Sequence, residues 1–447
     1  MRSLRGVSLD TSRHILTPAA CQKDEGAVAA IATAGSPLRQ ALRLREFRLL
    51  LGTQLAVGLT QPLLFFTQGW YVTTAAPEGK AVLYLGALGA SRGLAFLAYV
   101  LFGGAFADRF PRRQVLIVSQ FVSLVMTVGI GALLLVPAVN DGEGWLLPLM
   151  IALFATFGLV QGQDGPTRTS MLRDVVPEAA LSSALSFFFM LVSAALLVAA
   201  PFSGWSLEHL GIGATYLISA TGPAAILACA LPMKSAGMAA DPDARRESVW
   251  ENLRGGLRVL AEEPAVRWTV LLTWISTAAG LSVMGVLIGA WVKDVLLLGA
   301  SGWGYLAVFW GLGSVLSTTY LMTRSSLQHR GWLFLGACGG LGAAVLGFSF
   351  SRSIPIAFAF NGMAGVTFMV MNTVSLAIVQ AMVPNRVLGR VTGLLLLGGG
   401  LMQVTGLLVG LLAAAIGIEH TYTAAACVIM ATTALVALRQ RPLRVLD

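Results

Sequence analysis

The sequence predicts an all-α membrane protein in which twelve transmembrane helices form two pseudo-symmetric bundles of six. Hydrophobic residues make up 56% of its 447 residues and charged residues only 11%, against roughly 25% charged in an average soluble protein. The apolar runs are continuous and do not alternate, which disfavours a transmembrane β-barrel. One long polar stretch divides the apolar segments six and six, and this predicts the two bundles.

Twelve apolar segments are close to the length of about 20 residues that a helix needs to cross a bilayer. Their approximate ranges are 47–74, 81–105, 114–137, 146–166, 179–206, 212–233, 268–292, 301–323, 331–351, 354–380, 388–417 and 420–438. The predicted organisation is a polar tail without the apolar run of a signal peptide (1–40), a bundle (41–233), a central loop (234–267), a second bundle (268–438) and a short tail (439–447). Within the central loop, residues 244–263 can form an amphipathic surface helix.

The distribution of basic residues predicts the orientation of the chain. With the N-terminus inside, 26 of the 30 Lys and Arg residues lie in cytoplasmic segments, whereas Lys80, Lys293 and Arg352 lie outside and Arg92 lies within a span. Cytoplasmic loops of membrane proteins carry an excess of Lys and Arg. We therefore expect both termini to be cytoplasmic. The same excess explains the net charge of +9 without nucleic-acid binding.

Several classes of activity lack the residues that they need. The sequence has no HExxH motif, no histidine cluster within a span and no phosphate-binding GxxxxGK[ST] loop. The four cysteines, Cys21, Cys229, Cys338 and Cys427, form no CxxC pair. We therefore expect no enzymatic activity, no cofactor and no metal. A secondary transporter is the leading hypothesis, and a non-transporting membrane receptor or scaffold is the alternative from a different class.

The loop between the second and third spans carries the most informative motif, Gly104-x-x-x-Asp108-Arg109-x-x-Arg112-Arg113. It resembles motif A of the major facilitator superfamily, with Pro111 where that motif usually has Gly. The wider string most resembles the enterobactin-exporter branch and related drug:proton antiporters. The resemblance implies a monomeric transporter in a bacterial cytoplasmic (inner) membrane, which exports a small molecule such as a drug or siderophore in exchange for protons. Import on the same fold is the rival direction.

The resemblance also implies a latch at the inner face of the membrane. Asp108 would face the start of span eleven near Arg390, where a carboxylate is favoured by the helix N-terminus. Arg112 would meet an acid at the inner end of span four, for which Asp164 is the candidate. Asp164 could instead pair with Arg168, four residues further on. In this interpretation no carboxylate lies at mid-membrane.

Span five contains a segment that is similar to the antiporter motif of exporters. Pro201 and Gly204 match that motif, whereas Ala200 and Trp205 depart from it. A proline kink is also common in membrane helices without antiport, so the match alone leaves both interpretations open.

Polar residues within the spans are candidates for a substrate cavity, because the resemblance implies that spans one, four, seven and ten line it. Interhelical hydrogen bonding is the alternative role. Besides Arg92, the candidates are Gln54, Gln61, Gln161, Thr273, Trp274, Thr277, Asn361, Asn372 and Gln403. Trp70 and Trp291, which lie near span ends, are expected in the interfacial aromatic belt.

Arg92 stands out among these candidates. It lies 11 residues from the outer end of span two, or about 17 Å at 1.5 Å per residue. An arginine at this depth costs roughly 2.5–3.5 kcal/mol on insertion scales and usually faces a cavity or a partner. Gly89 and Gly93 beside it would let another helix approach. We expect Arg92 to hold an anionic or electron-rich substrate or to repel protons from a nearby site, and snorkelling to the outer interface is the alternative.

Overall fold

The computed structural model describes residues 37–107, 111–162, 164–234, 249–322 and 329–444, which form helices and no strand. Asp108 and Arg109 of the predicted latch lie outside these residues. The N-terminal half contains α2 (Pro37–Arg43), α3 (Arg45–Ala75), α4 (Ala81–Ala107), α5 (Arg112–Leu133), α6 (Pro137–Asn140), α7 (Leu146–Gly162), α8 (Asp164–Val175), α9 (Glu178–Ser219) and α10 (Thr221–Ala230).

The C-terminal half begins after α11 (Val249–Glu262), the amphipathic helix of the central loop. Its first span is α12 (Pro264–Ser276), η1 (Thr277–Leu281), α13 (Ser282–Val286), α14 (Ile288–Ala290) and η2 (Trp291–Val295), in which η1 and η2 are π-helical turns. There follow α15 (Ala300–Met322), α16 (Arg330–Ser349), α17 (Ile354–Met382), α18 (Asn385–Leu396), α19 (Gly398–Ile416), α20 (Ile418–Arg439) and α21 (Arg441–Arg444).

Each predicted span coincides with helix in the structure. By length and composition, nine helices in the described part of the chain could cross a membrane. The long segment Ser183–Ala230 is one of the nine, and it reverses direction at Gly211, whose φ of 83° only glycine adopts readily. Val192, which precedes Gly211, packs against Gly58 of α3, and Gly222, which follows Gly211, packs against Thr60 of the same helix. The chain therefore returns along α3 after Gly211. This reversal agrees with the predicted break between spans five and six.

The central loop and the C-terminal tail contain more packed helix than the sequence suggested. In α11, Leu260 is buried, and the helix packs against α18, where Gly256 meets Leu394. In α21, Leu443 is buried, and its carbonyl lies close to Gly331 at the start of α16. Both short helices therefore extend the C-terminal bundle.

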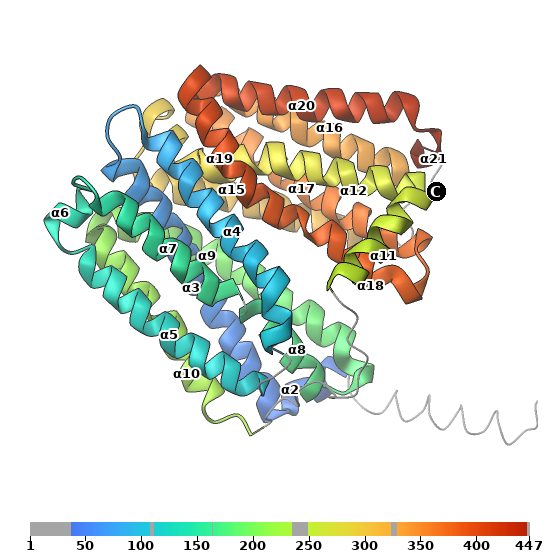
Figure 1. Cartoon of the computed structure of the whole chain (residues 1–447), viewed down its shortest axis with the longest axis horizontal. Helices are drawn as coiled ribbons and strands as arrows, with labels where there is room; N and C mark the ends of the chain where they lie inside the picture. Colours follow the sequence, from blue (N-terminus) through green and yellow to red (C-terminus); the bar gives the residue numbers. More distant parts are fainter. Residues whose placement is uncertain (1–36, 108–110, 163, 235–248, 323–328, 445–447) are drawn as a thin grey trace, which may run out of the picture.

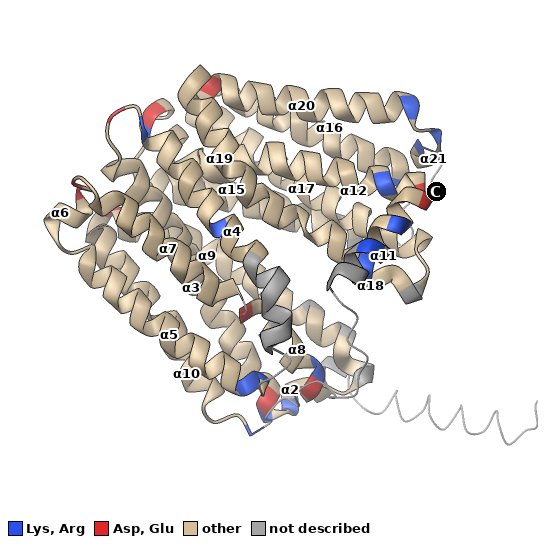
Figure 2. Ribbon diagram, in the orientation of Figure 1, with Lys and Arg blue, Asp and Glu red and all other residues tan. Residues whose placement is uncertain are grey.

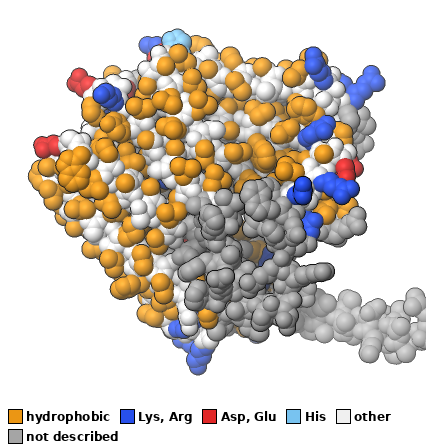
Figure 3. Space-filling view, in the orientation of Figure 1, with side chains coloured by type: hydrophobic (Ala, Val, Ile, Leu, Met, Phe, Trp, Pro, Cys, Tyr) orange, Lys and Arg blue, Asp and Glu red, His pale blue; other side chains and the backbone are white. Residues whose placement is uncertain are grey.

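Charged residues gather at the ends of the helices (Figure 2). One end is here called the arginine-rich end. There α5 begins, α8 and α20 end, and α11 and α18 lie, and these helices carry Arg112, Arg113, Arg173, Arg439, Arg258 and Arg390. The other end, here called the opposite end, carries Lys80, Glu208, Lys293, Asp294, Arg352 and Glu419. Between them the face shown in Figure 3 is mostly hydrophobic. This distribution is that of a multi-pass membrane protein whose apolar belt faces lipid.

The two halves share one core, which residues of the N-terminal half join towards the opposite end, and each half also has a cluster of its own at the arginine-rich end. The shared cluster includes Leu85 and Leu207 together with Val286 and Trp303 of the C-terminal half. At the arginine-rich end one cluster contains only residues of the N-terminal half, such as Leu116, and another contains only residues from α11 to α19. Figure 1 shows the same divergence, because the halves meet at the left and point apart towards the bottom and the right.

Close helix contacts across the boundary depend on glycine. In α4, a Cβ on Gly86 would lie 2.9 Å from Gly410 Cα, and one on Gly93 would lie 2.6 Å from the backbone nitrogen of Val404 in α19. Small residues allow such close approach between membrane helices. The expectation that glycines beside Arg92 admit a neighbouring helix is thus confirmed, and α19 is that helix.

Candidate functional site

Arg92 lies in α4 at the boundary between the two halves, where neutral groups surround its guanidinium. Its Nη2 donates a hydrogen bond to Oε1 of Gln68, and its Cζ lies 5.0 Å from the ring centroid of Phe65. Gln68 Nε2 in turn donates to the hydroxyl of Tyr216 at 3.1 Å. The guanidinium is therefore held in the bundle by an amide and an aromatic face, and it does not snorkel to the outer interface.

No carboxylate within the described ranges forms an ion pair with Arg92. The ion pairs that join two described residues elsewhere include Arg112–Asp174, Arg168–Asp164, Arg258–Glu262 and Arg352–Glu419. A cation–π contact and one hydrogen bond compensate only part of the cost of removing an arginine from water. Arg92 thus keeps its positive charge unneutralised at mid-depth.

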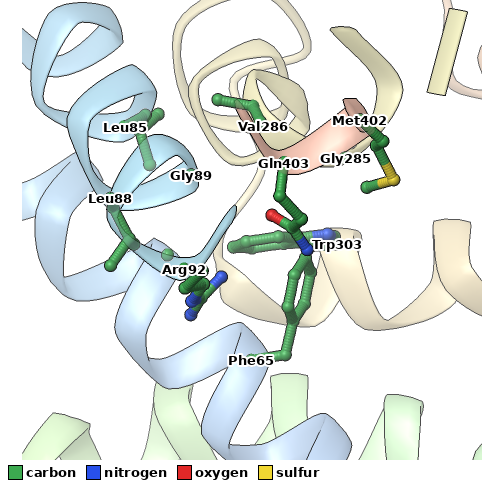
Figure 4. A pocket seen from close by; sticks show the side chains of 11 residues that line it. Phe65, Leu85, Leu88, Gly89, Arg92, Gly285, Val286, Trp303, Met402 and Gln403 are labelled. Carbon is green, nitrogen blue, oxygen red and sulfur yellow. The ribbon is translucent and has the colours of Figure 1, made fainter. Parts of the chain in front are cut away.

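A small cavity lies next to Arg92, and both halves contribute to its walls. Phe65 and Arg92 face Trp303 and Gln403 across it, as Figure 4 shows. Its volume of about 20 Å³ gives room for one water molecule. Because the wall combines α3 and α4 with α15 and α19, any relative movement of the halves must change its shape.

Two larger cavities share the aromatic wall. A cavity of about 150 Å³ is lined by Phe65, Phe66, Trp303 and Asn361 among others. A cavity of about 390 Å³ is lined by Phe65, Phe66 and Gln61 among others. The rings of Phe66 and Trp303 meet edge to face with centroids 4.8 Å apart. Aromatic walls with a few polar groups are typical of sites for small organic molecules.

A second buried arginine, Arg168, belongs to a closed network inside the N-terminal half. Its Nη2 lies 3.2 Å from Asp164 Oδ2, and its Nη1 donates to Gln54 Oε1 at 2.9 Å. Gln120 of α5 donates to Asp164 Oδ1 at 2.8 Å. The network links α3, α5 and α8, and Asp164 and Arg168 are only 5% and 4% exposed.

This network corrects the predicted place of Asp164 at the inner end of span four. Helix continues to Val175, so Asp164 lies 11 residues, or about 17 Å, before its end. Among the acidic residues whose side chains the structure describes, Asp164 is the one that is buried. Arg168, assigned to a cytoplasmic loop from the sequence, is likewise inside the bundle.

The predicted pair between Arg112 and Asp164 is wrong, because Arg112 pairs with Asp174 at 2.7 Å. Asp174 lies in the last turn of α8, at the arginine-rich end where α5 begins with Arg112. Asp164, the first residue of α8, lies about three helical turns before Asp174 and is out of reach of Arg112. Asp164 takes Arg168 instead, which was the alternative left open by the sequence.

Two other residues of the predicted latch, Arg113 and Arg390, have described contacts inside their own halves. Gly104 lies in the last turn of α4. Arg113 donates to the carbonyl oxygens of Ala230 and Leu231 in the same half, and the side chain of Arg390 packs on Gly255 of α11. The expected contact between Asp108 and Arg390 falls on residues that are not described, so it stays a prediction.

Pro201 and Gly204, the antiporter-like residues, lie where α9 crosses α15 between the halves. A Cβ on Gly204 would lie 2.7 Å from the carbonyl oxygen of Ala300, and one on Gly304 would lie 2.7 Å from that of Ala200. Nearby, a carboxylate oxygen of Glu208 accepts a hydrogen bond from the backbone N–H of Ser301 at 3.2 Å. These contacts hold the halves together at the opposite end.

The structure separates the polar cavity candidates into two groups. Gln61, Arg92, Asn361 and Gln403 line the three cavities. Four others form structural hydrogen bonds instead: Gln54 accepts one from Arg168, Thr273 donates to the carbonyl oxygen of Thr269, Trp274 to that of Leu394, and Asn372 to that of Phe368. The last two do not line these cavities: Thr277 is buried at a π-helical turn, and Gln161 is half-buried in α7.

Sequence reasoning missed the aromatic side of the site and misplaced one tryptophan. Phe65 and Trp303 carry no polar signal, although a pair of adjacent phenylalanines in the middle of span one could have drawn attention to α3. Trp291, expected in the interfacial belt, is fully buried against Phe348 and Tyr422. No cluster of three His, Cys, Asp or Glu residues that could bind a metal occurs in the described ranges.

Comparisons with known proteins place this geometry in context. The family model described as Major Facilitator Superfamily matches residues 51–406. Among curated proteins, the multidrug efflux pump Tap of Mycolicibacterium fortuitum is 24% identical over 342 residues, which cover 74% of this chain and 81% of Tap.

Solved structures show the same fold at low sequence identity. A POT family transporter in complex with 5-aminolevulinic acid has a TM-score of 0.71 and 10% identity, covering 90% of this chain and 97% of its own. The nucleoside transporter NupG has a TM-score of 0.69 and 11% identity, with 89% and 100% covered. A bacterial homolog of the human lysosomal transporter Spinster, in an inward-facing and unoccupied conformation, has a TM-score of 0.62 and 15% identity, with 88% and 95% covered.

Proposed function

Because the chain belongs to the major facilitator superfamily, whose members are membrane transporters, we propose that it exports a small organic molecule in exchange for protons. The proposal includes a bacterial cytoplasmic membrane as its location, with both termini on the cytoplasmic side. The multidrug efflux pump Tap, a bacterial relative, supports export. Import by the same fold is the alternative direction.

The observation that carries the proposal is the pair of cavities, of about 20 and 150 Å³, whose aromatic walls come from both halves. The halves are joined at the opposite end by contacts such as Gly204 with Ala300, and they have separate cores at the arginine-rich end. Alternating access requires a central site with an interface that can open on either side. With a cytoplasmic N-terminus, the contacts that join the halves lie towards the outer side of the membrane.

Proton coupling rests on the motif resemblance and on one buried acid. Asp164 is paired with Arg168 inside the N-terminal half, and intramembrane carboxylates commonly serve as proton sites. Protonation of Asp164 would leave the charge of Arg168 without its partner. In the proposal, the proton gradient drives transport by protonating Asp164 and so changing this pairing.

Direction and coupling can be tested together in cells with and without the protein. Accumulation of a panel of dyes, drugs and siderophores is measured, and export predicts lower accumulation of at least one compound. A protonophore, which collapses both the pH gradient and the membrane potential, should abolish that difference. Higher accumulation in the presence of the protein would show import, and export that persists after the protonophore would contradict proton coupling.

A further inference from the structure

The charge balance of the central cavities restricts the class of molecule that they can bind. Arg92 lines the smallest of the three cavities and has no carboxylate partner in the described part of the chain. None of the residues that line the three cavities is Asp or Glu. A cationic ligand would find no counter-ion there and would be repelled by Arg92, whereas an anion would neutralise it.

The geometry around Arg92 leaves donors for such an anion. A guanidinium has five N–H groups, and Arg92 uses one hydrogen bond to hold Gln68. The amide of Gln403, from the other half, lies across the cavity from Arg92 (Figure 4). Guanidinium groups bind carboxylates and other oxyanions by charge-assisted hydrogen bonds, which are about twice as strong as neutral ones.

The remaining surface of the site suits an apolar body with rings. Phe65 lines all three cavities, and Phe65 and Trp303 pack edge to face with centroids 6.1 Å apart. Trp310 and Met284 extend the apolar wall of the 150 Å³ cavity. Aromatic pairs in edge-to-face contact present ring faces on which another ring can stack or pack edge-on.

We infer that the transported molecule is an aromatic organic anion with a single negative charge, whose charged group binds Arg92 and whose rings pack against Phe65 and Trp303. This inference rests on the proposed transport function. One bound anion neutralises one arginine, so the loaded site carries no net charge from this pair. Gln403 and Trp303 come from the C-terminal half, so the bound anion bridges the two halves that alternating access moves.

Ring-matched probes test the inference by binding. Full-length protein in nanodiscs is titrated with naphthalene-2-carboxylate and pyrene-1-carboxylate, and with the methylammonium compounds of the same ring systems, and binding to empty nanodiscs is subtracted. We expect the carboxylates to bind at least about tenfold more tightly than the ring-matched cations, as a single strong ion pair provides. Arg92→Gln should remove this preference, and Arg92→Glu should reverse it. Arg352→Gln, which removes an exposed arginine at the opposite end, should leave it unchanged.

Three results would overturn the inference: cations that bind wild type as tightly as the carboxylates, a preference that survives in Arg92→Gln, or no binding of any probe to wild type. A monodisperse elution profile for each variant shows that a loss of binding does not reflect misfolding. The cellular export assay is independent of these results. Export of cations with no effect of Arg92→Gln would defeat the inference and leave the proposed function intact.

Discussion

Arg92 and Arg168 are both arginines inside membrane helices of the N-terminal half, but their surroundings differ. Arg168 meets a carboxylate and two backbone oxygens within one bundle, whereas Arg92 meets an amide and an aromatic ring at the boundary of two bundles. A neutralised arginine surrounded by its own half strengthens that half. An arginine that is held only by neutral groups, next to a cavity shared by both halves, keeps a positive charge that a bound anion can neutralise.

Substitutions of the two arginines are expected to differ most in their effect on the free energy of unfolding. Arg168→Ala would leave Asp164 buried without its counter-ion, and breaking a buried pair in this way costs about 3–5 kcal/mol. We expect a large fall in the melting temperature of the purified protein. The double variant Asp164→Leu with Arg168→Leu removes both charges and should lose much less. Equal losses in the single and double variants would show that the ion pair is not the source of the effect.

Arg92→Leu is expected to change stability little or in the opposite direction. It leaves no buried carboxylate alone, and it removes a charge that costs roughly 2.5–3.5 kcal/mol at mid-span on insertion scales. The melting temperature should therefore stay the same or rise, while affinity for the aromatic carboxylates falls. A destabilisation as large as that of Arg168→Ala would show that Arg92 stabilises the fold and would contradict this prediction.

Gln68 and Gln54, both on α3, provide a matched pair of substitutions. Gln68→Leu removes the hydrogen bonds to Arg92 and Tyr216, and Gln54→Leu removes the one to Arg168. A hydrogen bond to a charged arginine is worth about 1.5–3 kcal/mol of stability, and the neutral bond to Tyr216 about 1 kcal/mol. Only Gln68→Leu should also change affinity for the carboxylate probes, because only Gln68 orients the arginine that binds them. An equal effect of both on affinity would mean that the two sites are coupled.

Arg112→Gln should have the smallest effect on stability. The side chains of Arg112 and Asp174 are 24% and 27% exposed, and exposed ion pairs contribute about 0.2–1 kcal/mol. If the latch assignment is correct, the transport rate falls while the melting temperature hardly changes. Arg258→Gln, which removes a still more exposed pair with Glu262, is the control and should leave transport unchanged. Normal transport in Arg112→Gln would contradict the latch.

The positions of the helices, the superfamily and the place of Arg92 inside a span could be predicted from the sequence alone. Hydropathy is a local property, so it locates spans without knowledge of their neighbours. The break near Gly211 and the close approach of a helix at Gly93 also follow from local composition, since glycine permits both. The motif from Gly104 to Arg113 identified the superfamily because its spacing is contained in one short loop.

Only the tertiary structure decided which groups meet. The partner of Arg112 depends on how far α8 continues beyond the apolar segment, and this length placed Asp174 at the helix end and Asp164 three turns inside. Trp303 and Gln403 join Arg92 from parts of the chain more than 200 residues away, a contact fixed by the rotation and tilt of packed helices. Hydropathy carries no information on rotation or tilt, because every side of a membrane helix can be apolar, and so the pairing of polar groups emerged only from packing.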